Sequence, residues 1–382
     1  MVNTKWKEVS VKDLMKIETG SRNTEDKIDN GQYPFFVRSQ TVEHIDSFHY
    51  DCEAVLTAGD GVGTGKVFHY INGKFDAHQR VYVMSQFKDV LGKYFYYWFS
   101  KNFFAEVAKY TAKSSVDSVR KQMIAGMVLP LPSAEEQQKI VGILSDIDTL
   151  ITNLQKLIQK KKDIRQGTMQ MLVTGKKRLG NFSGEWFDCT LDSIAYVLNG
   201  DRGVNYPSGD DFIEYGIPFI NAGNISNNIV DISTVDYISI EKYNSLGGVK
   251  IQKNDIIFCL RGSLGKCAIS NFTGGAPASS LCVIRAKDGI DARFLFHIIN
   301  SEITSRQIDN LNAGSSQPNL SAKSLKSFKF IIPKDVAEQE MISNILSDMD
   351  LDIYKLEEKL SKYQKIKQGM MEELLTGKVR LV

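Results

Sequence analysis

Two similar stretches decide the fold of this chain: LPSAEEQQKIVGILSDID at Leu131–Asp148 and IPKDVAEQEMISNILSDMD at Ile332–Asp350. Each belongs to a longer repeat, because residues 136–179 match residues 338–381 at a constant offset of 202 residues. Within this alignment 21 of the 44 positions are identical, including the TGK-x-RL that ends each copy. Identity this high at one fixed offset identifies an internal duplication, so the chain consists of two related halves.

Each copy has the apolar spacing of one long helix. In the first copy, apolar residues alternate steps of four and three positions: Ile140, Leu144, Ile147, Ile151, Leu154 and Ile158. The second copy has the same steps: Ile342, Leu346, Met349, Ile353, Leu356 and Leu360. This is the heptad spacing of a coiled coil, and the Thr-Gly pairs at 174–175 and 376–377 are typical helix ends. The spacing predicts a helix over residues 136–173, roughly 55 Å long at ~1.5 Å per residue, and a second one like it.

The residues that precede each helix form a fainter repeat. Trp6, Pro34-Phe35, Gly65-Lys66 and Ser114-Ser115 recur as Trp186, Pro218-Phe219, Gly265-Lys266 and Ser315-Ser316. The offsets change along the chain, as expected if loops of different length separate shared elements. We therefore expect a module and a helix, followed by a second module and a second helix, at residues 1–132, 133–180, 181–333 and 334–382.

The connectivity also predicts how the helices pair. The first helix starts beside the first module and ends a few residues before the second module begins. Two equal units with self-complementary seams pair most simply about a two-fold axis, which makes the helices antiparallel. The predicted fold class is α+β: two globular mixed α/β modules separated by two long helices, paired as an antiparallel coiled coil with pseudo-two-fold symmetry.

Composition narrows the class of protein. Hydrophobic residues make up 42% and charged residues 24%, which is typical of globular chains. No apolar run approaches the roughly 20 residues of a membrane helix, and the first residues lack the apolar core of a signal peptide. The five cysteines form no C-x-x-C pair, which favours reduced thiols and disfavours a zinc site. We expect a cytoplasmic protein with no membrane contact and no bound metal.

The sequence offers little support for catalysis. The glycine-rich segment Gly59–Lys66 lacks the Walker A pattern, because Asp60 stands where glycine is needed and Val67 where serine or threonine is needed. We interpret it as a tight β-turn. There is no Pro-Pro for an adenine methyltransferase motif and no Gly-x-Ser-x-Gly for a serine nucleophile. The residues therefore indicate a two-headed binder with no catalytic residues, and a hydrolase that uses Gly59–Lys66 stays open as an alternative.

Two modules, each followed by a P-x(3,4)-E-Q-x(2)-I helix start, resemble the specificity subunit of type I restriction–modification enzymes. LNAGSSQPNLSAKSLKSFKFIIP at Leu311–Pro333 is similar to the usual end of a target recognition domain in that family. The resemblance implies that each module reads one half of a split, asymmetric target in double-stranded DNA. It implies that the helices set the half-site spacing and dock two methyltransferase subunits, and that restriction subunits complete the complex.

The resemblance further implies that this chain has no active site or cofactor of its own. S-adenosylmethionine for adenine-N6 methylation, and ATP and magnesium for restriction, would be bound by the partner subunits. An orphan scaffold of the same kind, which binds DNA without restriction partners, is the alternative that the sequence leaves open.

Candidate DNA contacts follow from residue chemistry. In the major groove, arginine and lysine recognise guanine, whereas asparagine and glutamine recognise adenine. Serine can donate hydrogen bonds to phosphates. In the first module the candidates are Arg38, Ser39, Gln40, Lys66, Arg80, Lys113, Ser114 and Ser115. In the second module they are Asn221, Asn224, Arg261, Ser263, Lys266, Ser315, Ser316, Gln317 and Lys323. Arg285 is a further basic residue near a predicted loop. The competing interpretations are a capped turn, a surface hairpin and a helix cap.

Overall fold

The computed structural model describes residues 6–111, 118–180, 182–312 and 319–381. It divides the chain into two compact units. Unit 1 consists of Met1–Lys156 together with Glu357–Val382, and unit 2 is the continuous segment Leu157–Leu356. Each unit therefore contains one module, the beginning of one long helix and the end of the other. Among the described residues, no helix combines the length and the apolar character needed to cross a membrane.

The first module is built on a six-stranded sheet with the order β2-β7-β5-β6-β3-β4. All of its pairings are antiparallel except that of β3 with β6. A separate strand pair, β1 with β8, leads into the first long helix. The elements are β1 Lys7–Ser10, α1 Val11–Leu14, β2 Lys16–Thr19, β3 Tyr33–Phe36, β4 Glu43–Ile45, β5 Tyr50–Ala58, β6 Phe68–Ala77, β7 Val81–Ser85, α2 Gly92–Thr111, α3 Lys121–Ala125 and β8 Val128–Leu131.

Helix α2 supplies the aromatic part of this module's core. Phe95, Phe99 and Phe103 are fully buried, and successive rings stack at centroid distances of 5.2 and 4.4 Å. Phe68 on β6 meets Phe99 edge to face at 5.6 Å. Phe99 therefore holds the helix against the sheet, whereas the hydroxyl of Tyr97 donates to Asp148 at 2.7 Å on the other side. None of the five aromatic residues at positions 94, 95 and 97–99 is exposed for base stacking.

The second module repeats this frame with additions. One four-stranded sheet has the order β10-β19-β16-β17 and another β11-β15-β12-β18. The elements are β9 Trp186–Thr190, α5 Leu191–Ile194, β10 Ala195–Asn199, β11 Phe212–Ile213, β12 Ile217–Ile220, β13 Ile225–Ser226, β14 Ile229–Val230, β15 Asp236–Ile238, α6 Ile240–Ser245, β16 Ile256–Cys259, β17 Cys267–Ile269, β18 Ala276–Pro277, β19 Leu281–Ala286, α7 Ala292–Ile299, α8 Glu302–Asn312, α9 Ala322–Lys326 and β20 Lys329–Pro333.

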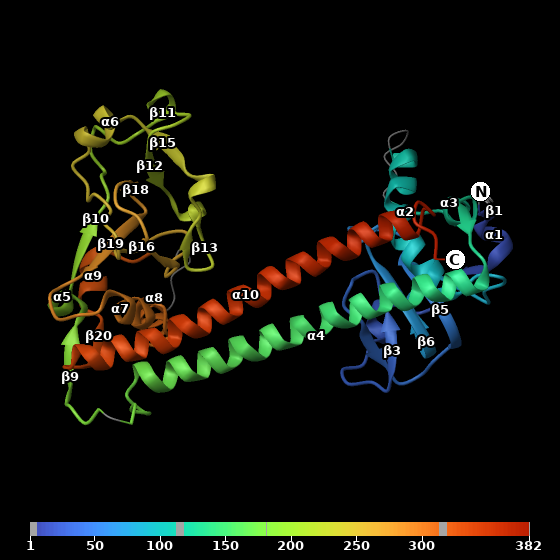
Figure 1. Cartoon of the computed structure of the whole chain (residues 1–382), viewed down its shortest axis with the longest axis horizontal. Helices are drawn as coiled ribbons and strands as arrows, with labels where there is room; N and C mark the ends of the chain where they lie inside the picture. The colour runs from blue at the N-terminus through green and yellow to red at the C-terminus, as the bar shows by residue number, and fades with distance from the viewer. Residues whose placement is uncertain (1–5, 112–117, 181, 313–318, 382) are drawn as a thin grey trace. The chain divides into compact units, whose positions relative to one another are not determined.

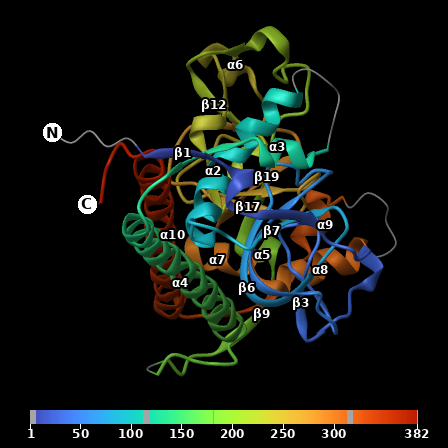
Figure 2. The same cartoon turned by 90° about the vertical axis from the view of Figure 1, so that its right-hand side faces the viewer.

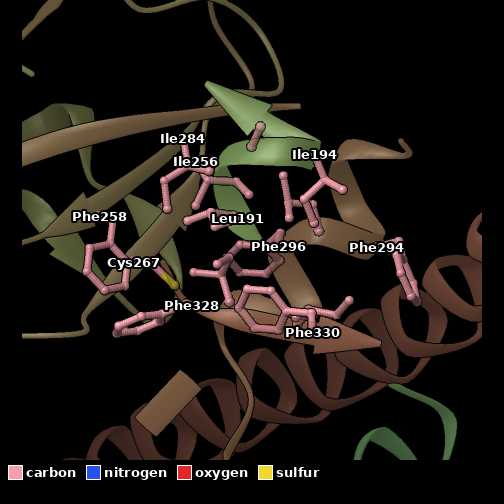
Figure 3. Close-up of a cluster of buried hydrophobic side chains, with 14 of the residues drawn as sticks. Leu191, Ile194, Ile256, Phe258, Cys267, Ile284, Phe294, Phe296, Phe328 and Phe330 are labelled. Atoms are coloured by element: carbon pink, nitrogen blue, oxygen red, sulfur yellow. The ribbon is translucent and has the colours of Figure 1, made fainter. Parts of the chain in front are cut away.

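The faint sequence repeat is thus a repeat of topology. The parallel contact of β3 with β6 recurs as β12 with β18, and the pair β1–β8 recurs as β9–β20. Long β6 corresponds to two shorter strands, β17 and β18, and α2 corresponds to α7 and α8. Figure 3 shows part of the buried core of this module, with Phe328 and Phe330 below Phe296, and Ile256 and Ile284 from the sheet above Leu191.

The two long helices are α4, Ala134–Val173, and α10, Val336–Leu374. The predicted start at residue 136 was two residues late, and the predicted end at 173 matches. In unit 1, Ile140 and Leu144 at the beginning of α4 share a buried cluster with Leu374 at the end of α10. In unit 2, Leu172 near the end of α4 shares a cluster with Ile342 and Leu346 at the beginning of α10. Within each unit the two helix segments therefore run antiparallel, as the traces in Figures 1 and 2 show.

Candidate nucleic-acid interface

Three separate loops of the first module meet at one carboxylate. Arg38 follows β3, Asp60 follows β5, and Arg80 lies in the turn between β6 and β7. The Arg38 guanidinium donates to Asp60 Oδ1 at 2.9 Å, and the Arg80 guanidinium donates to Asp60 Oδ2 at 3.1 Å. Asp60 is 19% exposed, whereas the two arginines are 46% and 62% exposed. The carboxylate thus orients two cations toward solvent, and we call these three residues the Asp60 cluster.

His78 completes the surroundings of this cluster. Its Nδ1 accepts a hydrogen bond from the Arg80 backbone N–H at 2.9 Å, which fixes the turn that presents Arg80. Burial first, and then the nearby charge of Arg38, lower the pKa of His78 below its ordinary value. At neutral pH the site therefore has two cations, one carboxylate and a neutral imidazole, which gives it a net positive charge suited to phosphate or guanine.

The remaining first-module candidates lie nearby with looser contacts. Ser39 Oγ donates to the Thr41 carbonyl at 2.9 Å, and Gln40 Nε2 donates to the Phe68 carbonyl at 3.5 Å. The Lys66 ammonium lies 5.6 Å from the centre of the Phe104 ring on α2. All three candidates are exposed. They are therefore accessible to a ligand, although each already has a contact within the module.

The Gly59–Lys66 segment connects the antiparallel strands β5 and β6. It does not lead from a strand into a helix, which a phosphate-binding loop requires. Gly61 and Gly65 adopt positive φ angles of 78° and 69°, so the segment is the tight turn that the sequence predicted. Val62 at its tip is fully exposed. Among the described residues no group of three or more histidine, cysteine, aspartate or glutamate side chains could hold a metal ion.

In the second module the loop after β12 is closed on itself. Asn221 Oδ1 accepts from the Gly223 N–H at 2.8 Å. Asn224 is only 3% exposed; its Nδ2 donates to the Thr234 carbonyl at 2.7 Å and its Oδ1 accepts from the Asn221 N–H at 2.8 Å. Because its amide is buried and bonded on both sides, Asn224 positions the loop. This corrects our expectation that its side chain faces DNA.

The loop between β16 and β17 presents the other second-module candidates. Arg261 and Ser263 are exposed, and Arg261 has no side-chain partner among the described residues. The Lys266 ammonium donates to the Ala222 carbonyl at 3.2 Å, which ties this loop to the one after β12. Beside it an open cavity of about 710 Å³ is lined by Gly262, Ser263, Leu264, Lys266, Ile308, Asp309 and Asn312. The loop therefore offers one guanidinium without a partner among the described residues, and the next residue in the chain lines the hollow.

The other candidates fall into three groups. Lys323 is exposed on α9. Arg285 instead donates to both carboxylate oxygens of the buried Asp255 at 2.7 Å, so it is structural and not a free basic residue near a loop. Six candidates lie outside the described residues: Lys113, Ser114, Ser115, Ser315, Ser316 and Gln317.

One clamp in each unit, built on a buried glutamate, holds the module to the long helices. In unit 1 the carboxylate of Glu136 accepts two hydrogen bonds from Arg380, at 2.8 and 2.9 Å, and one from Trp6 Nε1 at 3.0 Å. In unit 2 the carboxylate of Glu338 accepts two from Arg178, at 2.6 and 2.8 Å. Sequence reasoning found these residues as repeats but missed that each glutamate pairs with the arginine of the other copy.

The clamp residues have further shared features. Arg380 lies over the Trp6 ring at 5.2 Å, and Arg178 lies over the Trp186 ring at 5.5 Å. The hydrogen bonds from Arg380 are the largest cause that lowers the pKa of Glu136 below its ordinary value. The glutamines that follow the glutamates hold the loops before α2 and α7, where Gln137 accepts from the Leu91 N–H and Gln339 from the Asp291 N–H. The repeated Glu-Gln pair thus fixes the module on its helix.

Comparison with known proteins agrees with this arrangement. The family model for the type I restriction modification DNA specificity domain matches twice, at residues 3–163 and 184–368. The MjaVIII type I restriction enzyme specificity subunit of Methanocaldococcus jannaschii is 24% identical over 344 residues, which are 86% of this chain and 79% of the relative. The EcoDI specificity subunit of Escherichia coli is 30% identical over 175 residues, which are 45% and 38% of the two chains.

Solved structures show the same fold. The S subunit of a type I restriction–modification system from M. genitalium aligns over 98% of this chain and 97% of its own, with a TM-score of 0.67 at 18% identity. A chain from a structural study of type I complex assembly and conformational transition aligns over 99% and 100%, with a TM-score of 0.55 at 12% identity. At these identities the likeness establishes the architecture of the modules and helices, and nothing finer.

Proposed function

Because the chain belongs to the family of type I restriction–modification DNA specificity proteins, we propose that each of its modules reads one half of a bipartite, asymmetric DNA target. The observation that carries this proposal is the pair of loop sites. Both modules use the same backbone frame to present basic side chains, but the first presents the Asp60 cluster and the second presents Arg261 beside a hollow. Different side chains on one frame are what two different half-sites require.

The partners follow from the same premise. The relatives are specificity subunits of type I restriction enzymes, so the chain is expected to combine with methyltransferase subunits and, for cleavage, with restriction subunits. In this division the chain is non-catalytic. S-adenosylmethionine, ATP and magnesium belong to the partner subunits, and this chain contributes positioning on DNA through its loops and docking through its helices.

The decisive experiment tests methylation with and without the partner. The purified chain alone is expected neither to methylate nor to cleave DNA. Together with the methyltransferase subunit of its own system, it is expected to direct adenine methylation to one split motif, which single-molecule sequencing reveals. Methylation or cleavage by the chain alone would refute the proposal, and cleavage that depends on Gly59–Lys66 would favour the hydrolase alternative.

A module exchange tests independent reading. Replacing residues 1–131 with the first module of another family member should change one half of the methylated motif and leave the other half unchanged. Changes in both halves would show that the two modules do not read separately.

We further propose that the helices set the spacing of the half-sites. Both helices run without interruption through residues 156–157 and 356–357, where the two compact units divide. Four residues inserted between Lys156 and Lys160 add about 6 Å at ~1.5 Å per residue, close to two base pairs, and about one helical turn. With a matching insertion between Glu358 and Lys362, the same half-sites should be methylated with a longer gap. A folded double insertion that keeps the original gap would refute this role.

A further inference from the structure

The turn that follows β6 in the first module has the same backbone as the turn that follows β18 in the second. In the first module the carbonyls of His78 and Arg80 accept backbone hydrogen bonds at 2.9 and 2.7 Å. In the second module the carbonyls of Ala278 and Ser280 accept the equivalent bonds, both at 2.9 Å. His78 therefore corresponds to Ala278 and Arg80 to Ser280, so the turn itself closes without a histidine.

His78 adds a side-chain hydrogen bond to this shared turn. The residue is buried, and its Nδ1 accepts from the Arg80 backbone N–H at 2.9 Å. Because a backbone N–H can only donate, Nδ1 has to carry a lone pair, and this nitrogen is unprotonated. Ala278 has no side-chain acceptor, and Ser280 has no guanidinium to position. The histidine and the arginine that it holds are therefore both particular to the first module.

Protonation of His78 removes this bond. Both ring nitrogens of an imidazolium are donors, so Nδ1 would face the Arg80 N–H with a hydrogen of its own. The new positive charge would also act on the guanidiniums of Arg38 and Arg80, which already share the one carboxylate of Asp60. A protonated His78 therefore frees the Arg80 turn and adds repulsion between like charges to the Asp60 cluster.

The surroundings of His78 favour its neutral form. Charged side chains from several segments surround the imidazole: Arg22, paired with the buried Asp76 at 2.9 Å, and Glu25, Arg38, Asp60 and Arg80. Burial is the largest cause that lowers the pKa of His78 below 6.5, and the charge of Arg38 is the next. Asp60 and Glu25 act in the opposite direction. The imidazole therefore stays neutral at physiological pH and becomes charged only in a more acidic range.

Other buried histidines lack this property. His69 Nε2 donates to the Ser39 carbonyl at 3.0 Å, and protonation of the ring keeps that donor. Of the two histidines that hold first-module loops, only His78 thus uses a nitrogen that protonation converts from acceptor to donor. The histidine of the second module is His297, and burial, followed by the charge of Arg165, lowers its pKa to about 4. It stays neutral over the range in which His78 becomes charged.

We propose that His78 makes reading of the first half-site depend on pH, and that reading of the second half-site lacks this dependence; this rests on the proposed function. The unprotonated imidazole holds Arg80 in its reading position through the backbone N–H, and protonation releases it. His78 is thus a positioning residue that acts on DNA through Arg80. Discrimination at the first half-site is fully present at neutral pH and is lost as the pH falls through the pKa of His78, which lies below 6.5.

The test uses the chain bound to its methyltransferase subunit, and DNA that carries the methylated motif either intact or altered in one half-site. Competition binding over a pH range of about 7.5 to 5.0 measures, for each half-site, the ratio of the affinities for intact and altered DNA. In wild type the ratio for the first half-site should fall about fivefold towards the acidic end, as expected for the loss of one hydrogen bond. The ratio for the second half-site should stay constant.

Two substitutions assign the effect to His78 and to its route. His78→Asn is the matched variant, because the Oδ1 of asparagine accepts from the backbone N–H two residues later and does not titrate. At neutral pH its ratio for the first half-site should lie between those of wild type and His78→Ala, and it should not change with pH. Arg80→Ala should lower the ratio at neutral pH and also abolish its pH dependence, because His78 acts through Arg80. Circular dichroism checks that each variant is folded.

The failures are distinguishable. If altering either half-site leaves the binding of wild type unchanged at neutral pH, the proposed function fails. If both half-sites are discriminated at neutral pH but the ratio for the first is constant with pH, or falls equally in His78→Asn, the role of His78 is wrong and the proposed function stands. An equal fall at both half-sites also refutes this role. A fall that persists in Arg80→Ala overturns the route through Arg80.

Discussion

Asp60 in the first module and Arg261 in the second occupy the same place in the backbone frame and carry opposite charges. Asp60 pairs in a β-bridge with Ser118, and Arg261 pairs in the same way with Asn319. The carbonyl of the preceding residue accepts an equivalent hydrogen bond in both modules. Gly59 accepts from the Val119 N–H at 2.7 Å, and Leu260 accepts from the Leu320 N–H at 3.1 Å. The two modules therefore share the backbone hydrogen bonds at this position, and they differ in the side chain that the position carries.

The difference changes how each module prepares its cations. In the first module the carboxylate of Asp60 orients two arginines before any ligand arrives, which reduces the entropy lost on binding. In the second module Arg261 has no such partner among the described residues and must be ordered by the ligand itself. The modules therefore share a scaffold and differ in both the chemistry and the preorganisation of their reading residues.

The clamps provide the sharpest test of what is shared. Glu136 accepts four hydrogen bonds, from Trp6, twice from Arg380 and from the Leu381 N–H, whereas Glu338 accepts two from Arg178. Both carboxylates are nearly fully buried. Loss of one partner in a buried pair costs about 3–5 kcal/mol when both are buried, and less where the arginine is partly exposed.

We therefore expect Glu136→Ala to lower the free energy of unfolding by about 3 kcal/mol and Glu338→Ala by about 2 kcal/mol. Urea unfolding followed by circular dichroism measures both. Glu185→Ala, which removes an exposed ion pair with Lys334, is the control and should cost nothing measurable. Equal losses at Glu136 and Glu338 would show that the extra hydrogen bonds in unit 1 do not stabilise it.

The clamps also show how far the sequence alone could lead. The helices were predictable because 21 identities and a strict apolar spacing define them. The pairing of each glutamate with the arginine of the other copy could also have been predicted from the sequence. Glu136 lies at the start of a helix of 40 residues and Arg178 lies beyond its end. A helix of that length is roughly 60 Å long, so the sequence alone argues against a contact between these two residues. With antiparallel helices, the arginine of the other copy is the partner that remains.

The Asp60 cluster could not be derived in that way. It depends on three loops that follow different strands, and no spacing in the sequence relates positions 38, 60 and 80. An aspartate among four glycines was the one visible signal, and it served only to reject a nucleotide loop. Asn224 misled for the opposite reason: its residue type suits adenine, but the loop uses both ends of its amide. Polar loop residues serve the loop and the ligand with the same chemistry, and only burial separates the two roles.

Arginine substitutions test the reading loops one module at a time. Arg38→Ala should weaken methylation of the first half-site by about 1–3 kcal/mol, or roughly 5-fold to 150-fold, and relax its specificity at one base pair. Arg261→Ala should do the same to the second half-site only. Methylation rates on DNA substituted in one half-site at a time measure both effects. An equal effect of either variant on both halves would contradict separate readout.

Removing the carboxylate of the Asp60 cluster separates charge from preorganisation. Asp60→Asn keeps the size of the side chain, removes its negative charge and leaves one acceptor oxygen, so at least one of the two arginines loses its partner. Affinity for non-specific DNA should rise, while discrimination between correct and altered first half-sites should fall about tenfold. Competition binding at two salt concentrations measures both quantities. Increased discrimination in this variant would show that Asp60 restrains the arginines in a non-reading position.

The pH dependence of unit 1 follows from the pKa of Glu136, which lies below its ordinary value of 4.5 in the folded chain. A depressed folded pKa means that the unfolded state binds the proton more readily. The contribution of the clamp is therefore fully present above pH 4.5 and is lost as pH falls through the lower, folded value. Between pH 3 and 6, the free energy of unfolding should fall more steeply with decreasing pH in wild type than in Glu136→Gln. Identical slopes would show that this carboxylate is not linked to stability.

The smallest expected effect separates the two tryptophans of the clamps. Both rings lie beneath an arginine and against a glycine, Gly377 in unit 1 and Gly175 in unit 2. Trp6 Nε1 donates to Glu136 at 3.0 Å, whereas the buried Nε1 of Trp186 has no partner among the described residues.

Tryptophan-to-phenylalanine substitution removes part of the ring contact at both sites but a hydrogen bond at only one. Trp6→Phe should therefore cost about 1 kcal/mol more than Trp186→Phe, because an intramolecular hydrogen bond contributes about 1 kcal/mol net. At Trp186 the substitution removes a buried donor that has no partner among the described residues, and this loses no hydrogen bond. Urea unfolding followed by far-ultraviolet circular dichroism compares the pair directly. A larger loss at Trp186 would mean that its indole N–H finds a partner, and the two clamps would then be more alike than their hydrogen bonds indicate.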